Sequence, residues 1–526
     1  MSIRVTTSRR YSTSHPFLGS VRLRYLTAAL LLITSLFTSA AGALCLPYEH
    51  SKLTALDGAR NDNLGKAVAV HDGVAVLGAP RDGFDNAGSA YVYVYDGAQW
   101  VQDQKLEPST PSASGLFGTS VAIHQDVIVV GSLEHHPDGT IVTGAAYIFR
   151  YNGSDWVEEV KLTHGAPEGR DRFGISVAVH GNTVLVGADG REVDNHDGAG
   201  QVSVYEDTGL TWAFTGTLPQ LDPSEDAFFG YDVAITDGFI IVGAWEDNDA
   251  ASNAGSAYIF SKSGGVWSQY QKLVPGSLAG GERFGGAVDI SGHRAVVGAQ
   301  WADPLNQGRG TAFVYELSSL GANWSLEAEL MASDAQPYDR LGIDVAISGD
   351  HILAGSLDDD PGNLSGAAYL FTRLGGTWSE RAKLEASDLQ NYDQFGYRLD
   401  IDGDWAIVGS PSEDEVAPGA GAAYAYQVGN LTLDVDQSSV AAGDWINFTA
   451  CGGYNTKEAH FTILEIDGVP IAGDLLSIGF FAADRTWTDS GIVPLDLAGS
   501  EVGFGVLTYD EADNVIWSQI ERVQIQ

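Results

Sequence analysis

Clusters of acidic residues in short polar segments are the part of this sequence best suited to bind a ligand. The densest are Asp194-Asn195-His196-Asp197-Gly198 and Asp358-Asp359-Asp360. Carboxylate and carbonyl oxygens are the ligands that Ca²⁺ prefers, so both segments are candidate calcium sites, although neither has full metal-loop spacing. The alternative is that these Asp and Asn residues only stabilise exposed turns.

Further acidic residues occupy equivalent segments along the chain, and we expect them to form a ligand-binding face. Two carboxylates at a suitable separation could also hydrolyse a glycosidic bond, but the sequence does not set that separation. No Gly-x-Ser-x-Gly nucleophile motif or phosphate-binding Gly loop is present, so we expect no catalytic residue and consider only Ca²⁺ as a cofactor. The residues of this expected face are Asp82, Asp85, Glu134, Asp138, Glu246, Asp247, Asp249, Glu413 and Asp414.

Three histidines form another candidate set. His71, His124 and His180 stand at one equivalent position in successive segments. Three histidines can hold a metal ion, but polar residues at a turn are the favoured interpretation.

All these residues are placed by an internal repeat. An aromatic residue or Leu followed by Gly occurs seven times, with gaps of 53, 56, 56, 55, 57 and 54 residues, and a second Gly follows 13 residues after the first. Between them, apolar residues alternate with small or polar ones in short runs, which is typical of strands. The glycine pairs are Gly65 and Gly78, Gly118 and Gly131, Gly174 and Gly187, Gly230 and Gly243, Gly285 and Gly298, Gly342 and Gly355, and Gly396 and Gly409.

Four strands per repeat predict an all-β, seven-bladed propeller, because stacking the repeats in a ring buries their faces and leaves few open edges. Six repeats have a fourth strand that begins at a Trp, but the seventh has none. A matching strand, Tyr48 to Leu53, precedes the first repeat instead. We therefore expect this segment to complete the last blade and close the ring.

The Phe-Gly and Gly-Ala-Pro pairs at this spacing resemble the FG-GAP repeats of the integrin α-subunit propeller and its bacterial relatives. The resemblance covers about residues 47–427 and implies the fold, whereas propellers host both binding proteins and enzymes. Integrin-type propellers carry a calcium loop between the first two strands of a blade. Here that connection is a tight turn in every repeat, such as His71-Asp72-Gly73, so those calcium sites are not expected.

The up-and-down order of strands in a blade sorts its connections onto two sides of the disc. Loops between the second and third strands, and loops between blades, lie on one side, whereas the other connections are short turns on the opposite side. The acidic residues of the expected ligand face lie in the first set. Function is often placed on loops held by a rigid scaffold, so we expect the binding surface there.

Residues 1–43 read as a secretory signal peptide, because Arg-rich residues precede an apolar run from Leu26 to Phe37 and small residues ending at Ala43. The run is too short for a typical membrane span. Export predicts a secreted, periplasmic or cell-surface protein. The net charge of −41 falls to near −46 once the five Arg of this segment are removed, which disfavours nucleic acid as a partner.

Residues 44–427 are assigned to the propeller, and residues 428–526 to an immunoglobulin-like β-sandwich, because the repeat is lost and six or seven short strands remain. The only cysteines, Cys45 and Cys451, either pair as a disulfide that ties the two parts together or remain free thiols.

These features lead to one functional hypothesis and two alternatives. The first is an exported, non-enzymatic binding or adhesion protein that presents its acidic loop face to a protein or glycan, with divalent cations as an additional ligand. The second is a secreted polysaccharide hydrolase or lyase that uses carboxylates on that face. The third is a structural component of a cell-surface assembly.

Overall fold

The computed structural model describes residues 47–133, 143–165, 169–303, 307–319, 321–358, 364–374 and 376–428, together with the strands between Thr432 and Ile525. Their regular secondary structure is almost entirely β, with one short 3-10 helix, η1 (Phe84–Asn86). Among them, no helix has the length and apolar character needed to cross a membrane. The signal-peptide segment, residues 1–43, lies outside the described residues.

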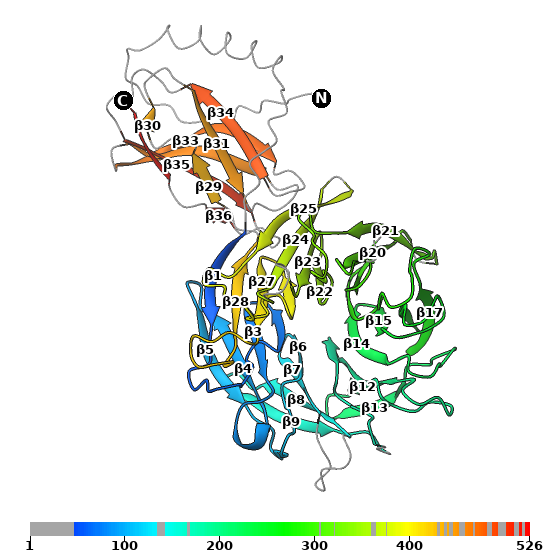
Figure 1. The fold of residues 1–526 in the computed structure, drawn as a ribbon. Helices are drawn as coiled ribbons and strands as arrows, with labels where there is room; N and C mark the ends of the chain where they lie inside the picture. The colour runs from blue at the N-terminus through cyan, green and yellow to red at the C-terminus, as the bar shows by residue number, and fades with distance from the viewer. Residues whose placement is uncertain are drawn as a thin grey trace, which may run out of the picture. The chain divides into compact units, whose positions relative to one another are not determined.

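Seven antiparallel four-stranded sheets follow one another around a ring, which confirms the predicted propeller (Figure 1). In the first six blades the strands pair in chain order. These blades are β2 (Ala67–His71), β3 (Val74–Ala79), β4 (Ser89–Tyr95) and β5 (Trp100–Leu106); β6 (Ser120–His124), β7 (Val127–Ser132), β8 (Ala145–Tyr151) and β9 (Trp156–Leu162); β10 (Val177–His180), β11 (Thr183–Ala188), β12 (Gln201–Asp207) and β13 (Trp212–Thr217); β14 (Phe229–Thr236), β15 (Phe239–Ala244), β16 (Ser256–Ser263) and β17 (Val266–Leu273); β18 (Ala287–Ser291), β19 (Arg294–Ala299), β20 (Thr311–Leu317) and β21 (Trp324–Leu330); and β22 (Val345–Ser348), β23 (His351–Ser356), β24 (Ala367–Leu374) and β25 (Thr377–Leu384).

The seventh blade combines the two ends of the repeat array. Its inner strands are β26 (Leu399–Asp402), β27 (Trp405–Ser410) and β28 (Ala422–Gln427), and its outer strand is β1 (Tyr48–Leu53). The pairing of β1 with β28 is antiparallel and places Lys52 opposite Tyr424. The segment before the first repeat therefore closes the ring.

Apolar side chains fill the space between neighbouring blades. The aromatic residue before the first Gly of the repeat is fully buried, as for Phe117, which packs edge-on against Tyr147 with 5.3 Å between ring centroids. One cluster at this junction joins residues of the first and second blades, including Val92 and Val130. The core is thus a set of interblade layers, as expected when single sheets cannot bury both of their faces alone.

The two glycines of each repeat meet at the junction between blades. The N–H of Gly118 donates to the carbonyl oxygen of Gly131 at 2.9 Å. A Cβ atom on Gly131 would collide with the carbonyl oxygen of Gly174 in the next blade. Gly118 itself has a φ of 93°, which residues with a side chain rarely adopt. The spacing of the two glycines therefore reflects a backbone contact that recurs around the ring.

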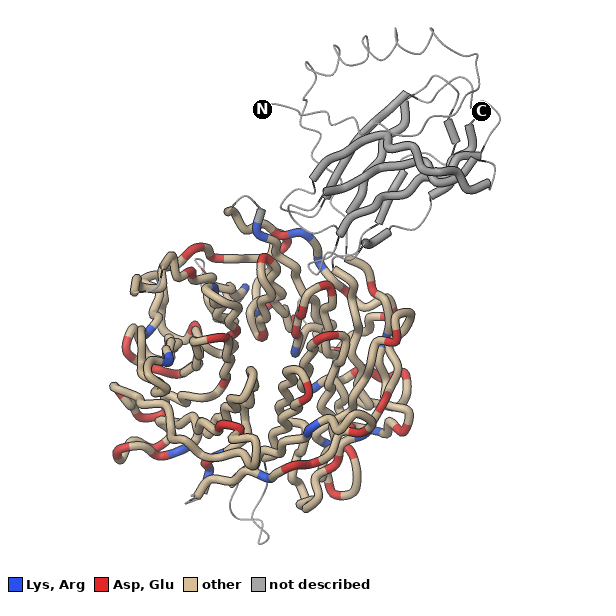
Figure 2. The backbone as a smooth tube through the Cα atoms, turned by 180° about the vertical axis from the view of Figure 1, so that it is seen from behind, with Lys and Arg blue, Asp and Glu red and all other residues tan. Residues whose placement is uncertain are grey.

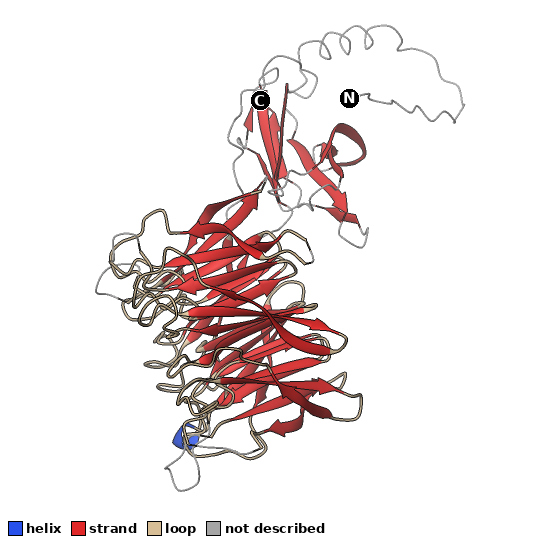
Figure 3. Ribbon diagram, turned by 90° about the vertical axis from the view of Figure 1, so that its right-hand side faces the viewer, coloured by secondary structure: helices blue, strands red, loops and turns tan. Residues whose placement is uncertain are grey.

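The side view in Figure 3 shows the longer loops gathered on one side of the disc. We call this side the loop face; it consists of the loops between second and third strands, including η1, and the loops between blades. The turn face is the opposite side, formed by tight turns such as the one between β2 and β3.

The strands after the last blade form two further sheets, which together make a β-sandwich. The assignment of an immunoglobulin-like topology and the boundary at residue 428 remain predictions. One sheet has the order β29-β31-β34, and the other has the order β30-β37-β35-β32-β33 with β36 paired to β35. The strands are β29 (Thr432–Val435), β30 (Ser439–Val440), β31 (Trp445–Cys451), β32 (Glu458–Ile466), β33 (Val469–Phe480), β34 (Thr486–Ile492), β35 (Glu501–Tyr509), β36 (Val515–Trp517) and β37 (Glu521–Ile525).

Candidate functional site

Three acidic residues of the expected ligand face are buried and paired with lysines. Asp82, Asp247 and Glu413 are at most 6% exposed. Their carboxylates lie 2.6, 2.8 and 2.9 Å from the ammonium groups of Lys105, Lys272 and Lys52, respectively. These three carboxylates are therefore buried and neutralised, which removes them from the surface that a ligand could contact.

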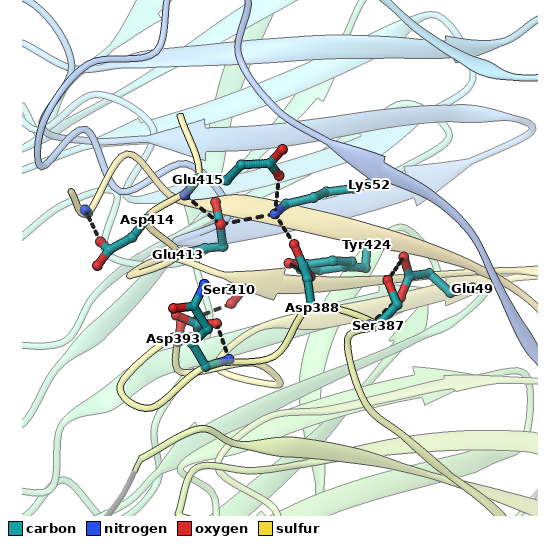
Figure 4. Close-up of polar contacts among 12 residues, drawn as sticks. Glu49, Lys52, Ser387, Asp388, Asp393, Ser410, Glu413, Asp414, Glu415 and Tyr424 are labelled. Carbon is teal, nitrogen blue, oxygen red and sulfur yellow. Dashed lines mark hydrogen bonds and ion pairs between the residues drawn. The ribbon is translucent and has the colours of Figure 1, made fainter. Parts of the chain in front are cut away.

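The cluster around Lys52 shows how such a site is built (Figure 4). Its ammonium group also contacts Asp388 and Glu415, and the hydroxyl of Tyr424 donates to Asp388 at 2.7 Å. One carboxylate comes from the loop that enters the blade, two come from the loop between its second and third strands, and Lys52 comes from β1. The cluster thus fastens two loops of the loop face to the closing strand.

The other members of the expected ligand face have different surroundings. Asp85 lies in η1 and is exposed, whereas Glu246 lies 3.4 Å from Arg283. Asp249 contacts Lys272, and Asp414 accepts a hydrogen bond from the N–H of Gly419 at 2.6 Å. Glu134 and Asp138 lie outside the described residues.

The predicted calcium segments do not gather into one site. Asp194 is exposed in a tight turn, where the N–H of His196 donates to the carbonyl oxygen of Val193 at 2.9 Å, and Asp197 is also exposed. Asp358, from another blade, accepts a hydrogen bond from the N–H of Leu364 at 3.1 Å. Asp359 and Asp360, Cys45 and the side chain of Cys451 lie outside what the structure describes, so calcium binding and the disulfide remain predictions.

The three histidines do come together on the turn face. The rings of His71 and His124 are 4.7 Å apart and those of His124 and His180 are 4.4 Å apart, centroid to centroid. His124 accepts a hydrogen bond from the N–H of Gly181 in the next blade at 3.2 Å. Burial, followed by the two neighbouring histidines, lowers the pKa of His124 to about 4, so this ring is neutral and can act as an acceptor near neutral pH.

Two groups among the described residues bring three potential metal ligands together. His71, Asp72 and Asp402 place one ligand atom each within 4.8 Å of one another. Each nitrogen of His71 faces one of the two carboxylates, at 3.5 and 3.6 Å. The second group, Asp388, Glu413 and Glu415, surrounds the ammonium group of Lys52, which already supplies the positive charge.

The centre of the ring holds a cavity of about 240 Å³, lined by the first strand of every blade. Four of its lining residues are acidic and all come from blades four to seven: Asp232, Asp289, Asp344 and Asp400. Each accepts a hydrogen bond from a backbone N–H of the following blade, from Val288, Ile347, Leu399 and Val70, respectively, at 2.6 to 2.8 Å. These carboxylates therefore join neighbouring first strands across the junctions.

Replacing Asp289 by Asn is expected to stabilise the propeller at about pH 8 but not at about pH 4. Burial raises the pKa of Asp289 to about 7, whereas an unfolded Asp has a pKa of about 3.9. Folding therefore takes up a proton between these values, and the free energy of unfolding falls as the pH rises through that window.

Asn cannot ionise, and its carbonyl oxygen can still accept the hydrogen bond from Ile347. The bond from the N–H of Ile290 to the other oxygen is lost at both pH values, so it does not change the difference between them. The expected gain at the higher pH is on the order of 1–2 kcal/mol, because Asp289 is only half-buried and solvent screens part of its charge. Denaturant unfolding at both pH values measures it, and an equal difference between variant and parent at both would contradict the explanation.

A second pocket, of about 430 Å³, lies where the central channel opens on the loop face, and we call it the mouth pocket. It is lined by Lys66, Arg81, Tyr231, Tyr397 and Arg398, among others. The ammonium group of Lys66 lies 3.7 Å from the centroid of the Tyr397 ring, and the guanidinium carbon of Arg398 lies 5.0 Å from it. Two cations thus share one aromatic ring at the edge of this pocket.

This arrangement changes the acidity of two groups. Burial lowers the pKa of Lys66, because desolvation disfavours its charged form. Burial alone would raise the pKa of Tyr397, but Arg398 and Lys66 together have the larger effect and hold it below its ordinary value. A basic, aromatic pocket therefore opens on a protein whose acidic residues greatly outnumber its basic ones (Figure 2).

Sequence reasoning missed both the lysine clusters and the mouth pocket, although signals for each exist. Lys105-Leu106 and Lys272-Leu273 end the outer strands of their blades, and their partners Asp82 and Asp247 lie in the loops between the second and third strands of the same blades. The mouth pocket is marked by the residue after the first Gly of a repeat. The residue at this position differs between the repeats, although the aromatic residue or Leu and the Gly before it recur. In the seven repeats it is Lys66, Thr119, Ile175, Tyr231, Gly286, Ile343 and Tyr397.

The seven blades form a closed ring, and the same glycine contact recurs between neighbouring blades. The chain is therefore a seven-bladed β-propeller. Seven segments match the family model described as FG-GAP repeat, so the chain belongs to the FG-GAP repeat family. A ligand-binding or structural role is the function that this fold suggests. The matched residues are 48–93, 100–149, 156–205, 212–260, 267–315, 324–371 and 378–426.

Comparisons with curated proteins and solved structures add nothing to the family assignment. No curated protein matches the chain. A fungal alcohol oxidase of the AA5 family, in complex with copper, is 11% identical, with a TM-score of 0.42 over 92% of this chain and 100% of that chain. A putative 6-phosphogluconolactonase from Bacteroides uniformis is 10% identical, with a TM-score of 0.43 over 62% of this chain and 86% of that chain. Similarity this low carries no functional conclusion.

Proposed function

We propose that this chain is an exported, non-enzymatic binding protein whose propeller presents its loop face to a protein or glycan ligand. The mouth pocket is the observation that carries the proposal. It is concave, it is lined by residues from several blades, and it combines apolar and aromatic side chains with a few charged and polar ones. Ligand sites typically have this composition and lie on a rigid scaffold.

The charges of the loop face support the same location. Asp82, Asp247 and Glu413 are buried beside lysines, so they stabilise the blades and contribute little to a surface. Lys66 and Arg398 instead contact an aromatic ring at the pocket edge. An incoming ligand would therefore meet the mouth pocket and the exposed acids around it, such as Asp85 and Asp414.

Blocking the mouth pocket is expected to abolish binding. Ile175 lines the pocket, and Ile175→Trp would fill part of it. The full chain is tested against glycan and protein arrays, with and without EDTA, so that a need for divalent cations such as Ca²⁺ is also measured. Ser154→Trp, at an exposed turn-face position, is the matched control and should bind as the parent does.

Loss of the same signals in Ile175→Trp alone supports the proposal. Equal binding by both Trp variants places the ligand elsewhere on the molecule, and the absence of any signal from the parent overturns a binding function.

A polysaccharide-active enzyme is the second candidate, and one observation favours it. The phenol of Tyr397 has a lowered pKa beside Lys66 and Arg398, which suits a group that accepts a proton from a substrate. Such an enzyme would use this phenol in place of the paired carboxylates that the sequence suggested. Release of unsaturated products from acidic polysaccharides, lost in Tyr397→Phe, would establish it over the binding function.

A further inference from the structure

Two of the three cations of the mouth pocket, Lys66 and Arg81, lack an acidic partner among the described residues. Within the described chain, no carboxylate lies within ion-pair distance of Lys66 or Arg81, and the ion pair of Arg398 with Asp344 is long, at 3.9 Å. Lys52, by contrast, contacts three carboxylates. In a chain of net charge −41, two neighbouring cations without an acid beside them among the described residues are unusual and need an explanation.

The geometry keeps these cations available to a ligand. Lys66 and Arg398 rest against the ring of Tyr397, and a cation held by an aromatic face keeps N–H donors for a ligand. Arg398 also donates to the carbonyl oxygen of Tyr397 at 3.1 Å, so Lys66 is the more available of the two. Arg81 is exposed at the pocket edge and also raises the local positive potential around Lys66. An anion that entered the pocket would therefore find Lys66 and Arg81 without displacing an existing ion pair.

Burial of an unpaired ammonium group has a cost that an anion would offset. The pKa of Lys66 is lowered because its charged form is partly desolvated and lies near Arg398 and Arg81. A bound carboxylate would favour the charged form of Lys66. Arginine at the same site adds paired donors that match the two oxygens of a carboxylate.

We propose that the mouth pocket binds the carboxylate of an acidic sugar, a hexuronate residue of a glycan. This inference rests on the proposed binding function and names the class of ligand. The remaining lining fits a sugar ring. Thr119 and Ser412 donate to Leu116 and Gln394, so their hydroxyl oxygens can still accept hydrogen bonds. Tyr231 offers an aromatic surface. A cavity of about 430 Å³ has the size of a small-molecule site.

Calorimetric titration of the full chain with galacturonate and glucuronate tests the proposal, with galactose, glutamate and inorganic phosphate as comparison ligands. Binding of a hexuronate and at least tenfold weaker binding of galactose are expected, because galactose lacks the carboxylate. Lys66→Gln and Arg81→Gln should each weaken hexuronate binding about tenfold, and the double variant about a hundredfold, since each removes one charged hydrogen bond.

Arg60→Gln is the matched control, because Arg60 is exposed in the loop before the first blade and does not line the pocket. It should bind as the parent does. Thermal unfolding shows that each variant is folded, and Arg81 is exposed, so its replacement keeps the test valid even if Lys66→Gln is unstable.

Three outcomes would overturn the inference. They are equal affinity for galactose and galacturonate, unchanged affinity in the double variant, and tighter binding of glutamate or phosphate than of either hexuronate. If any of these occurs while the parent still binds a ligand on the arrays and Ile175→Trp does not, only the proposed class of ligand is wrong. If the parent binds nothing on the arrays, the proposed function fails as well.

Discussion

Gly409→Ala is expected to destabilise the propeller by at least about 3 kcal/mol. Gly409 is the second glycine of the last repeat, and a Cβ atom on it would collide with the carbonyl oxygen of Gly65 in the first blade. The carbonyl oxygen of Gly409 also accepts a hydrogen bond from the N–H of Gly396 at 3.0 Å, so the strand cannot move away freely. The added methyl group therefore forces apart the junction that closes the ring.

Denaturant unfolding measures the loss, and limited proteolysis shows whether β1 becomes accessible as the junction opens. Gly276→Ala is the control, because a Cβ atom on Gly276 would have no neighbour within 4 Å and its φ is not unusual. A Gly409→Ala protein with the stability and protease resistance of this control would show that blade one and blade seven are not in close contact.

Lys52→Met is expected to lower the free energy of unfolding by about 2–4 kcal/mol. The substitution removes the ammonium group from between Asp388, Glu413 and Glu415. Glu413 is 2% exposed, so its charge would remain buried without a counter-ion. Asp388 and Glu415 are more exposed and lose less, because water can solvate them.

The second substitution Glu413→Gln separates this explanation from a simple loss of packing. In the Lys52→Met background, Glu413→Gln removes the uncompensated charge and should restore a large part of the stability, measured by denaturant unfolding. Its amide oxygen can still accept the hydrogen bond that the N–H of Glu415 now donates to Glu413 at 2.7 Å. A double variant less stable than Lys52→Met would show that the charge of Glu413 is not the cause.

The repeat was strong enough in the sequence to predict the blades and the junction residues. Phe117 and Gly118 recur in register in the other repeats, so their shared environment could be recognised without knowing distances. The missing fourth strand of the last repeat likewise pointed to the segment that became β1, which pairs with β28. Strand order and loop sides follow from chain order alone, because successive strands of a blade are adjacent in space.

The candidate site could be predicted much less well. The sequence favoured the acidic loops because they contain most of the charge, yet Asp82 and Glu413 are buried beside lysines of outer strands. The mouth pocket is instead lined in part by the single residues that follow the first Gly, such as Lys66 and Tyr397, which lie far apart in the chain. The sequence around each of these residues does not predict which of them face one another across the channel.

By itself, therefore, the sequence determined the all-β class, the number of blades, the segment that closes the ring and the sorting of loops onto two faces. Only the tertiary structure decided which charges neutralise one another and which remain for a ligand. The physical reason is range: hydrophobic alternation and turn residues act over a few positions, whereas an ion pair such as Lys52 with Asp388 joins residues 336 positions apart. Closing the ring brings such residues together, and among the described residues it leaves Lys66 and Arg81 at the mouth of the channel without an acid within ion-pair distance.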